Sequence, residues 1–200
     1  MKIYAALASI LLLSAPPVAA KTAPMTDAST FQTQQACEMK LDFKDTKEVK
    51  AWRPVLDGVM GGKSTGVRFA EDAHMSFKGI INTNGGGFSS IRRSMELGDL
   101  AGAESVKLRI KHDGRAYRLT FRTGANYWGR PVSYQLDIPQ TPKGVWTDVT
   151  LPLENFQTSI FGRRVRAPRF NPADVWEIGI ILADGIDGPF EINIGSVACG

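Results

Sequence analysis

The chain has 200 residues, of which 43% are hydrophobic and 22% charged, with 20 glycines and 11 prolines. This composition is typical of a turn-rich globular protein, and it excludes a mainly disordered chain, a collagen and a coiled coil. Two histidines leave little room for a histidine-based active site, and a net charge of +4 is too small to indicate nucleic-acid binding by itself. The length predicts one domain.

The N-terminus has the pattern of an export signal. Lys2 precedes an apolar run over residues 3–15, Pro16-Pro17 ends the run, and Val18-Ala19-Ala20 supplies small residues for cleavage. We predict a signal peptide over residues 1–20, with a membrane anchor as the alternative. Residues 21–36 are polar and lack periodicity, which indicates a flexible leader before one domain over residues 37–200. The mature chain is then periplasmic or secreted and has no transmembrane segment.

Export also bears on the two cysteines, Cys37 and Cys199, which lie near the two ends of the predicted domain. In an oxidising compartment an even pair of cysteines is more often bridged than free. We predict a Cys37–Cys199 disulfide; two buried thiols are the alternative.

The dominant hydrophobic period from Cys37 onward is two, as expected for half-buried antiparallel strands. Apolar and polar residues alternate over residues 37–43, 106–111, 117–122, 132–138 and 190–195, whereas residues 175–183 are apolar on both faces, as in a central strand. Short helical turns are predicted at residues 153–156 and at residues 171–174, where Asn171 can cap and Pro172 can take the first helical position.

Asp-Gly pairs at residues 57–58, 113–114, 184–185 and 187–188 mark turns. The strongest predicted hairpin joins residues 105–112 to residues 115–123 and places Arg109 opposite Arg118. With about eight to ten such strands and no crossover helices, the fold class is all-β, an antiparallel jelly-roll β-sandwich. A bulge is predicted near Gly195, which turns Cys199 to the face that Cys37 uses.

Sequence signals for catalysis are weak. Residues 61–64 resemble the end of a phosphate-binding loop, but Asp57 stands where that motif needs glycine and no helix follows. A nucleophile and a base in plausible context are lacking, so the sequence predicts no enzyme, no cofactor and no metal. A calcium site at Asp184 and Asp187 is the alternative to simple turns.

Three features of the sequence favour binding. The predicted hairpin has a basic outer face, with Asp137 on the next strand as a partial counter-charge, and a loop carries further arginines that suit phosphates, acidic sugars or an acidic protein. Tyr127 and Trp128 can stack on a sugar or anchor a protein, or tuck under the sandwich rim. A solvated face with local ion pairs is the plainer reading of the charges. The partner- or ligand-binding candidates are Arg109, Arg118, Arg122, Tyr127, Trp128, Arg163 and Arg164, with Lys107, Lys111, Arg166 and Arg169 nearby.

A series of motifs over residues 40–197 resembles the complex I intermediate-associated protein 30 family. The most specific block is Trp52 followed by residues 57–64, and Gly-Gly-Phe at residues 86–88 and Asp-Gly-Arg at residues 113–115 follow in order. The motif residues are Trp52, Asp57, Gly58, Met60, Gly61, Gly62, Ser64, Gly87, Phe88, Arg92, Asp113, Gly114, Arg115 and Tyr117.

The resemblance implies a jelly-roll sandwich like the galactose-binding-domain group. It also implies a non-enzymatic role, because the family assists assembly of respiratory complex I in the manner of a chaperone. We therefore expect an exported protein-binding module with an unidentified protein partner. A carbohydrate-binding module, favoured by the sandwich and by Tyr127 and Trp128, is the alternative.

Overall fold

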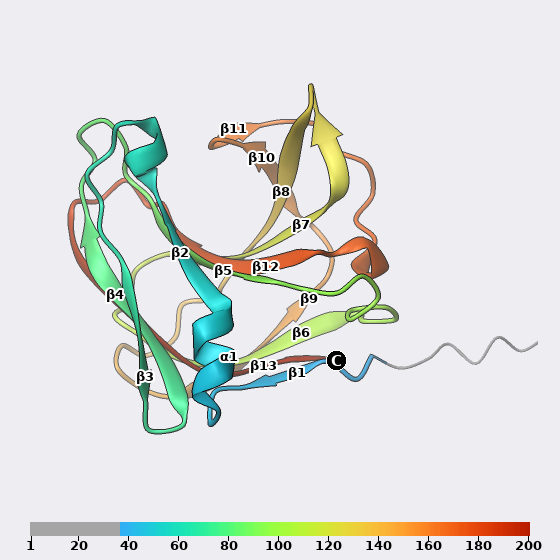
Figure 1. The fold of residues 1–200 in the computed structure, drawn as a ribbon, viewed down its shortest axis with the longest axis horizontal. Coiled ribbons are helices and arrows are strands. Elements are labelled where there is room, and N and C mark those ends of the chain that lie inside the picture. Colours follow the sequence, from blue (N-terminus) through green and yellow to red (C-terminus); the bar gives the residue numbers. More distant parts are fainter. Residues whose placement is uncertain (1–36) are drawn as a thin grey trace, which may run out of the picture. The chain divides into compact units, whose positions relative to one another are not determined.

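The structure is a computed structural model, and it describes residues 37–200. Two antiparallel sheets form a jelly-roll β-sandwich, as the sequence predicts (Figure 1). The predicted signal peptide and leader, residues 1–36, lie outside the described residues. In the described part, no helix is long and apolar enough to cross a membrane.

The six-stranded sheet has the order β3-β4-β13-β6-β9, with β1 also paired to β13. Its strands are β1 (Lys40–Asp42), β3 (Val67–Glu71), β4 (His74–Ile81), β6 (Ser105–His112), β9 (Thr147–Pro152) and β13 (Gly188–Cys199). The predicted bulge is confirmed, because the register of β13 against β6 shifts between Ile194 and Ser196.

The seven-stranded sheet has the order β11-β10-β8-β7-β12-β5-β2. Its strands are β2 (Trp52–Leu56), β5 (Ser89–Ser94), β7 (Tyr117–Tyr127), β8 (Arg130–Asp137), β10 (Gln157–Ile160), β11 (Arg163–Arg164) and β12 (Glu177–Leu182). Strand β12 lies between β7 and β5, which confirms the predicted central strand.

The predicted hairpin around Asp113-Gly114 is wrong. Strand β6 pairs with β13 and β9, whereas β7 pairs with β12 and β8, so the turn carries the chain from one sheet to the other. Arg109 and Arg118 are therefore not neighbours, and the supposed basic face is divided between two sheets. The alternation of apolar and polar residues shows which side chains of a strand face the core. The same alternation is expected whether a turn joins two paired strands or two strands of opposite sheets, so it could not distinguish these cases.

The helical segments agree with the sequence in part. The 3₁₀ turn η2 (Pro172–Asp174) forms as predicted, with the Asn171 side chain accepting from the Ala173 amide at 3.2 Å. Residues 153–156 form no helical turn, and Asp57-Gly58 begins a second 3₁₀ turn, η1 (Asp57–Met60). Helix α1 (Thr46–Ala51) was not expected, because six residues with one buried side chain give no periodic signal.

The core lies between the sheets and takes one face of each. Trp52, Leu119 and Ile192 are fully buried there, and Phe77 packs against Phe190 with ring centroids 5.2 Å apart. The opposite face of the seven-stranded sheet is therefore free for polar side chains. That face carries the site described below.

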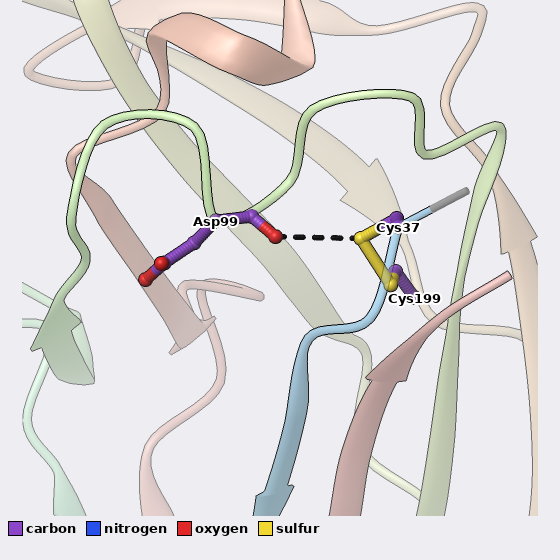
Figure 2. The surroundings of a disulfide bond; sticks show 3 residues. All are labelled: Cys37, Asp99 and Cys199. Carbon is purple, nitrogen blue, oxygen red and sulfur yellow. Dashed lines mark hydrogen bonds between the residues drawn. A yellow bond between two sulfur atoms is a disulfide. The ribbon is translucent and has the colours of Figure 1, made fainter. Parts of the chain in front are cut away.

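Cys37 and Cys199 form the predicted disulfide, with their Cα atoms 6.0 Å apart (Figure 2). It joins the segment before β1 to the end of β13, and the Cys37 sulfur lies 3.3 Å from the Asp99 carbonyl oxygen. This is a close contact and not a hydrogen bond, because a bridged sulfur carries no proton. The bridge closes a loop with a sequence separation of 162, most of the described chain.

Removing the bridge in a Cys37→Ser/Cys199→Ser variant is expected to lower the free energy of unfolding by about 2–4 kcal/mol, because the unfolded chain gains freedom. Urea denaturation measures the loss, and the variant should be insensitive to a reducing agent that destabilises the wild type. Native protein with two thiols open to alkylation would contradict the bridge.

Candidate functional site

A groove of about 660 Å³ lies over the outer face of the seven-stranded sheet. One side is formed by the glycine-rich loop at residues 86–88, next to Asp57 of η1, and the other by the hairpin of β10 and β11. Polar side chains of β7, β8 and β10 line the space between them, namely Thr120, Arg122, Ser133, Gln135, Gln157 and Ser159.

Strand alternation decides which side chains reach this groove. Ile178 and Ile180 of β12 face the core, so Glu177, Gly179 and Ile181 face outward. A Cβ at Gly179 would lie 3.0 Å from the Thr120 hydroxyl oxygen and 2.8 Å from a backbone oxygen. Glycine at the centre of β12 thus leaves the floor open to side chains from β5 and β7.

An arginine cluster occupies one end of the floor, around Glu177. The Glu177 side chain is 3% exposed and forms ion pairs with Arg53, with Arg92 at 3.5 Å and with Arg122 at 3.4 Å. Arg53 and Arg92 stand directly opposite each other on β2 and β5, a pairing of like charges that destabilises a sheet unless a counter-charge bridges it. Glu177 supplies one negative charge for three positive ones.

Burial and the crowding of positive charge in this cluster shift the pKa of Arg92. The pKa of Arg92 is lowered to about 10, mainly by burial and also by the charges of Arg122 and Arg53, while the charge of Glu177 opposes the shift. The guanidinium remains protonated at neutral pH and holds its charge in a partly desolvated position. Such a position attracts an anion more strongly than an exposed arginine does.

The other end of the floor is closer to electrical balance. Arg118 donates to Asp137 at 2.9 Å, as the sequence predicted, and Gln157 donates to the second oxygen of Asp137 at 2.9 Å. Arg164 of β11 lines the groove from its rim and is exposed. The positive excess therefore lies along the groove between Glu177 and Arg164.

Asp57 holds the loop that forms the first side of the groove. Its carboxylate is fully buried and accepts from the Ser64 hydroxyl at 2.6 Å, the Ser64 amide at 3.0 Å, the Gly87 amide at 2.7 Å and the Phe88 amide at 3.3 Å. A Cβ at Gly62 or Gly86 would lie 2.2 or 2.3 Å from this carboxyl group. The glycines of both motif segments are thus required by close approach to one side chain.

This arrangement also explains the likeness to a phosphate-binding loop. Backbone amides converge on an anion, but the anion is the carboxylate of Asp57 itself. Burial alone would raise the pKa of Asp57, and the hydrogen bonds from Ser64, Gly87 and Phe88 outweigh burial and lower it. The carboxylate is ionised at neutral pH and fully engaged.

A second cluster ties the ends of the sheets together through Arg115. The guanidinium donates to both oxygens of Asp184, at 2.7 and 2.9 Å, and to the carbonyl oxygens of Gly188 and Pro189. Asp184 is thereby occupied by a cation of the chain itself. Asp187 accepts from the Thr83 amide at 2.6 Å, and no three His, Cys, Asp or Glu side chains within residues 37–200 gather as metal ligands.

Tyr117 and His112 pack beside the Arg115 cluster. The Tyr117 hydroxyl lies 3.2 Å from an Asp113 oxygen, and burial, followed by the Asp113 charge, raises the pKa of Tyr117. Burial has the opposite effect on the imidazole and lowers the pKa of His112. The Nδ1 atom of His112 accepts a hydrogen bond from the Gly114 amide at 3.0 Å. This histidine supports the turn between the sheets and lies outside the groove.

The family model for Complex I intermediate-associated protein 30 (CIA30) matches residues 41–194. The chain belongs to this family. A relative from Caenorhabditis briggsae, named as a probable mitochondrial complex I intermediate-associated protein 30, is 32% identical over 91 residues. Those residues are 44% of this chain and 26% of the relative, so the match spans about a quarter of the relative's length.

Solved structures with the same fold include carbohydrate-binding modules. A family 11 module of a cellulosomal cellulase from Clostridium thermocellum has a TM-score of 0.61 at 16% identity, covering 82% of this chain and 95% of the module. A family 11 module from the same organism, in complex with a β-1,3-1,4-mixed-linked tetrasaccharide, has a TM-score of 0.58 at 16% identity over 82% and 97% of the two chains. At this identity the likeness concerns the fold.

The motif residues of this CIA30 chain lie mainly in supporting positions. Asp57 accepts hydrogen bonds from Ser64 and Gly87 and so holds the glycine-rich loop beside the groove. We call this arrangement the Asp57 clamp. Arg115 and Tyr117 join the two sheets. Arg92 is the motif residue whose charge faces the groove. The family signature thus includes the loop that forms one side of the groove and one arginine of its floor.

The predicted binding residues fall in three places. Arg118, Arg122 and Arg164 line the groove, whereas Arg163, Tyr127 and Trp128 lie at or beside two hairpin tips and are exposed. Arg109 lies on the other sheet, where it pairs with Asp148 at 3.1 Å and covers the Trp146 ring. Arg109 therefore does not belong to the candidate site.

Sequence reasoning missed Arg53 and Glu177. Glu177 gave a signal that could have been used, because it is an acidic residue inside the apolar run of a central strand. A buried acid of this kind needs partners, and arginines on neighbouring strands are the natural ones. Arg53 gave none, because its place opposite Arg92 depends on the pairing of β2 with β5.

Proposed function

We propose that this CIA30 chain is a non-catalytic binding protein that receives an acidic segment of a protein partner in the groove over the seven-stranded sheet. The observation that carries the proposal is the positive excess of the groove. Three arginines share Glu177, Arg164 stands at the rim, and the nearby Asp57 carboxylate is consumed by its own loop. An acidic segment would neutralise this excess.

Family membership supports a protein partner. The C. briggsae relative is named as an intermediate-associated protein of complex I, which describes association with a protein assembly. Apolar side chains of the groove, Val55, Ile181 and Phe161, can pack on the aliphatic parts of a bound peptide. An assembly-type or chaperone-like role follows from these two points together.

The chain is further proposed to act outside the cytoplasm, in the periplasm or as a secreted protein. The Cys37–Cys199 bridge supports this, because disulfides persist in oxidising compartments. The predicted signal over residues 1–20 supports it from the sequence.

A carbohydrate is the second candidate ligand, and the polar floor of the groove favours it. Hydroxyl and amide side chains from three adjacent strands, with Phe161 at the rim, are the groups that bind sugar hydroxyls and stack on sugar rings. The family 11 module of similar fold is described in complex with a tetrasaccharide. A neutral glycan would leave the arginine excess unexplained.

Crosslinking from the native envelope, with an oligoglutamate peptide and the mixed-linked tetrasaccharide as defined probes, tests the choice. Arg164→Glu is expected to weaken peptide binding and partner capture at least about tenfold, and added salt should weaken both, because exposed charges are screened. Lys107→Glu is the matched control, an exposed cation on the other sheet. If the tetrasaccharide binds with an affinity that neither added salt nor Arg164→Glu changes, and the peptide does not bind, the result would favour the carbohydrate.

A further inference from the structure

Two hairpins of the seven-stranded sheet end in the same unusual turn. Strands β7 and β8 are joined by Trp128-Gly129, with φ of 54° and 73°, and strands β10 and β11 by Phe161-Gly162, with φ of 47° and 75°. Two-residue turns with both φ angles positive strongly prefer Asn-Gly or Asp-Gly. Here each turn carries a large aromatic residue in place of the preferred residue.

An aromatic residue at this position of the turn is unfavourable for folding. A left-handed conformation costs a residue with a side chain about 1 kcal/mol or more, and asparagine tolerates it best. Burial does not offset the cost, because the residues of Trp128 and Phe161 are 87% and 62% exposed. Backbone strain that recurs at two exposed aromatic residues points to function.

The two tips lie together and form one surface. Strands β8 and β10 are paired, Ser133 with Ser159, and the Arg130 guanidinium lies 5.1 Å from the centre of the Phe161 ring. Tyr127, 45% exposed, adds a third ring 6.1 Å from that of Trp128. The β7–β8 tip projects beyond the rest of the sheet, with β11 beside it (Figure 1).

The charge of this surface has one sign. Residues 123–133 and 158–171, which include both tips, contain no Asp, Glu or Lys. They contain five exposed arginines, namely Arg130, Arg163, Arg164, Arg166 and Arg169. Arg130 and Arg163, which stand next to the two turns, form with the three rings what we call the aromatic–arginine tip, whereas Arg164 lines the groove.

We propose that the aromatic–arginine tip docks on the surface of an anionic lipid bilayer. Aromatic rings with a polar edge favour the depth of the headgroups, where Trp and Tyr are enriched in membrane proteins. Guanidinium groups pair with lipid phosphates, and each basic group near an anionic surface strengthens attachment. Trp128, which is 87% exposed and lies outside the residues that line the groove, suits a soft, extended surface better than a shaped ligand.

Vesicle sedimentation tests this proposal with the full-length mature protein. The protein should bind vesicles of phosphatidylcholine mixed with phosphatidylglycerol, and bind vesicles of phosphatidylcholine alone at least about fivefold more weakly. Brominated lipids should quench the fluorescence of Trp128. Trp128→Asn and Phe161→Asn should each weaken vesicle binding about tenfold while raising the melting temperature, because asparagine suits the turn.

Matched controls separate the tip from general stickiness. Phe69→Ala removes another exposed ring that has a cation over it, on the six-stranded sheet, and Lys44→Ala/Lys47→Ala removes two exposed charges near α1. Neither should change vesicle binding, whereas Arg130→Ala/Arg163→Ala should weaken it at least about tenfold. Arg122→Gln in the groove should also leave it unchanged, so failure of the groove proposal would be seen separately.

Three results would overturn the proposal. One is wild-type protein that binds neither kind of vesicle. Another is binding that Trp128→Asn and Phe161→Asn leave intact, which would reduce the effect to net charge. The third is loss of a captured envelope protein in these variants without any vesicle binding, which would assign the tip to a protein partner.

Discussion

Replacing Asp57 by alanine is expected to lower the free energy of unfolding by about 4–5 kcal/mol, in the range of severe single substitutions. The carboxylate is fully buried and accepts from the amides of Ser64, Gly87 and Phe88 as well as from the Ser64 hydroxyl. Its loss leaves several buried donors without a partner, each costing about 1–3 kcal/mol. The loop beside the groove should then loosen.

Urea denaturation of Asp57→Ala measures this, with Asp187→Ala as the control. Asp187 also accepts a backbone amide, that of Thr83 at 2.6 Å, but in an exposed setting where water replaces the bond. The control should lose no more than about 1 kcal/mol. Similar losses in the two variants would show that the Asp57 clamp is not a major support of the fold.

The lowered pKa of Asp57 also determines how the free energy of unfolding should depend on pH. The pKa of Asp57 and the pKa of Asp184 both lie below the ordinary value of 3.8 in the folded protein. Each carboxylate therefore adds stability that is complete above that value and is lost as the pH falls through the lower, folded pKa. Asp57→Asn should lose stability at neutral pH and show a shallower decline in acid.

Features that depend on local residues were predictable from the sequence. Alternation identified the strands, because each strand of a sandwich has one face in the core. The Asn171 cap and the bulge before Ser196 follow from residue types and parity close in the chain. The Cys37–Cys199 bridge followed from compartment and count, which need no knowledge of the fold.

Features that depend on which strands are neighbours were not predictable in this way. The Asp113-Gly114 turn has the residues of a hairpin, yet it crosses between sheets, because β7 pairs with β12 from a distant part of the chain. The arginine cluster depends on the same long-range pairing, since β2, β5, β12 and β7 must lie side by side. Arg122 could be named as a binding residue, but its position next to Glu177 could not.

Glu177→Gln is expected to destabilise the protein by about 3 kcal/mol, a typical cost of breaking a buried ion pair on one side. The side chain is 3% exposed, and its charge is shared by Arg53, Arg92 and Arg122. A neutral amide keeps the shape and leaves three guanidinium groups to repel one another. Asp137→Asn, which removes the exposed partner of Arg118, is the matched control and should cost no more than about 0.5 kcal/mol.

A second substitution separates charge repulsion from lost packing. Arg92→Met in the Glu177→Gln background removes the most buried of the three cations and should recover part of the loss, because an apolar side chain is tolerated where an unpaired charge is not. Sulfate should stabilise Glu177→Gln more than the wild type, measured against chloride at equal ionic strength, because an anion in the groove replaces the missing carboxylate. Equal effects of sulfate on both proteins would show that the arginines do not form an anion site, and the groove would then lose its claim to an acidic partner.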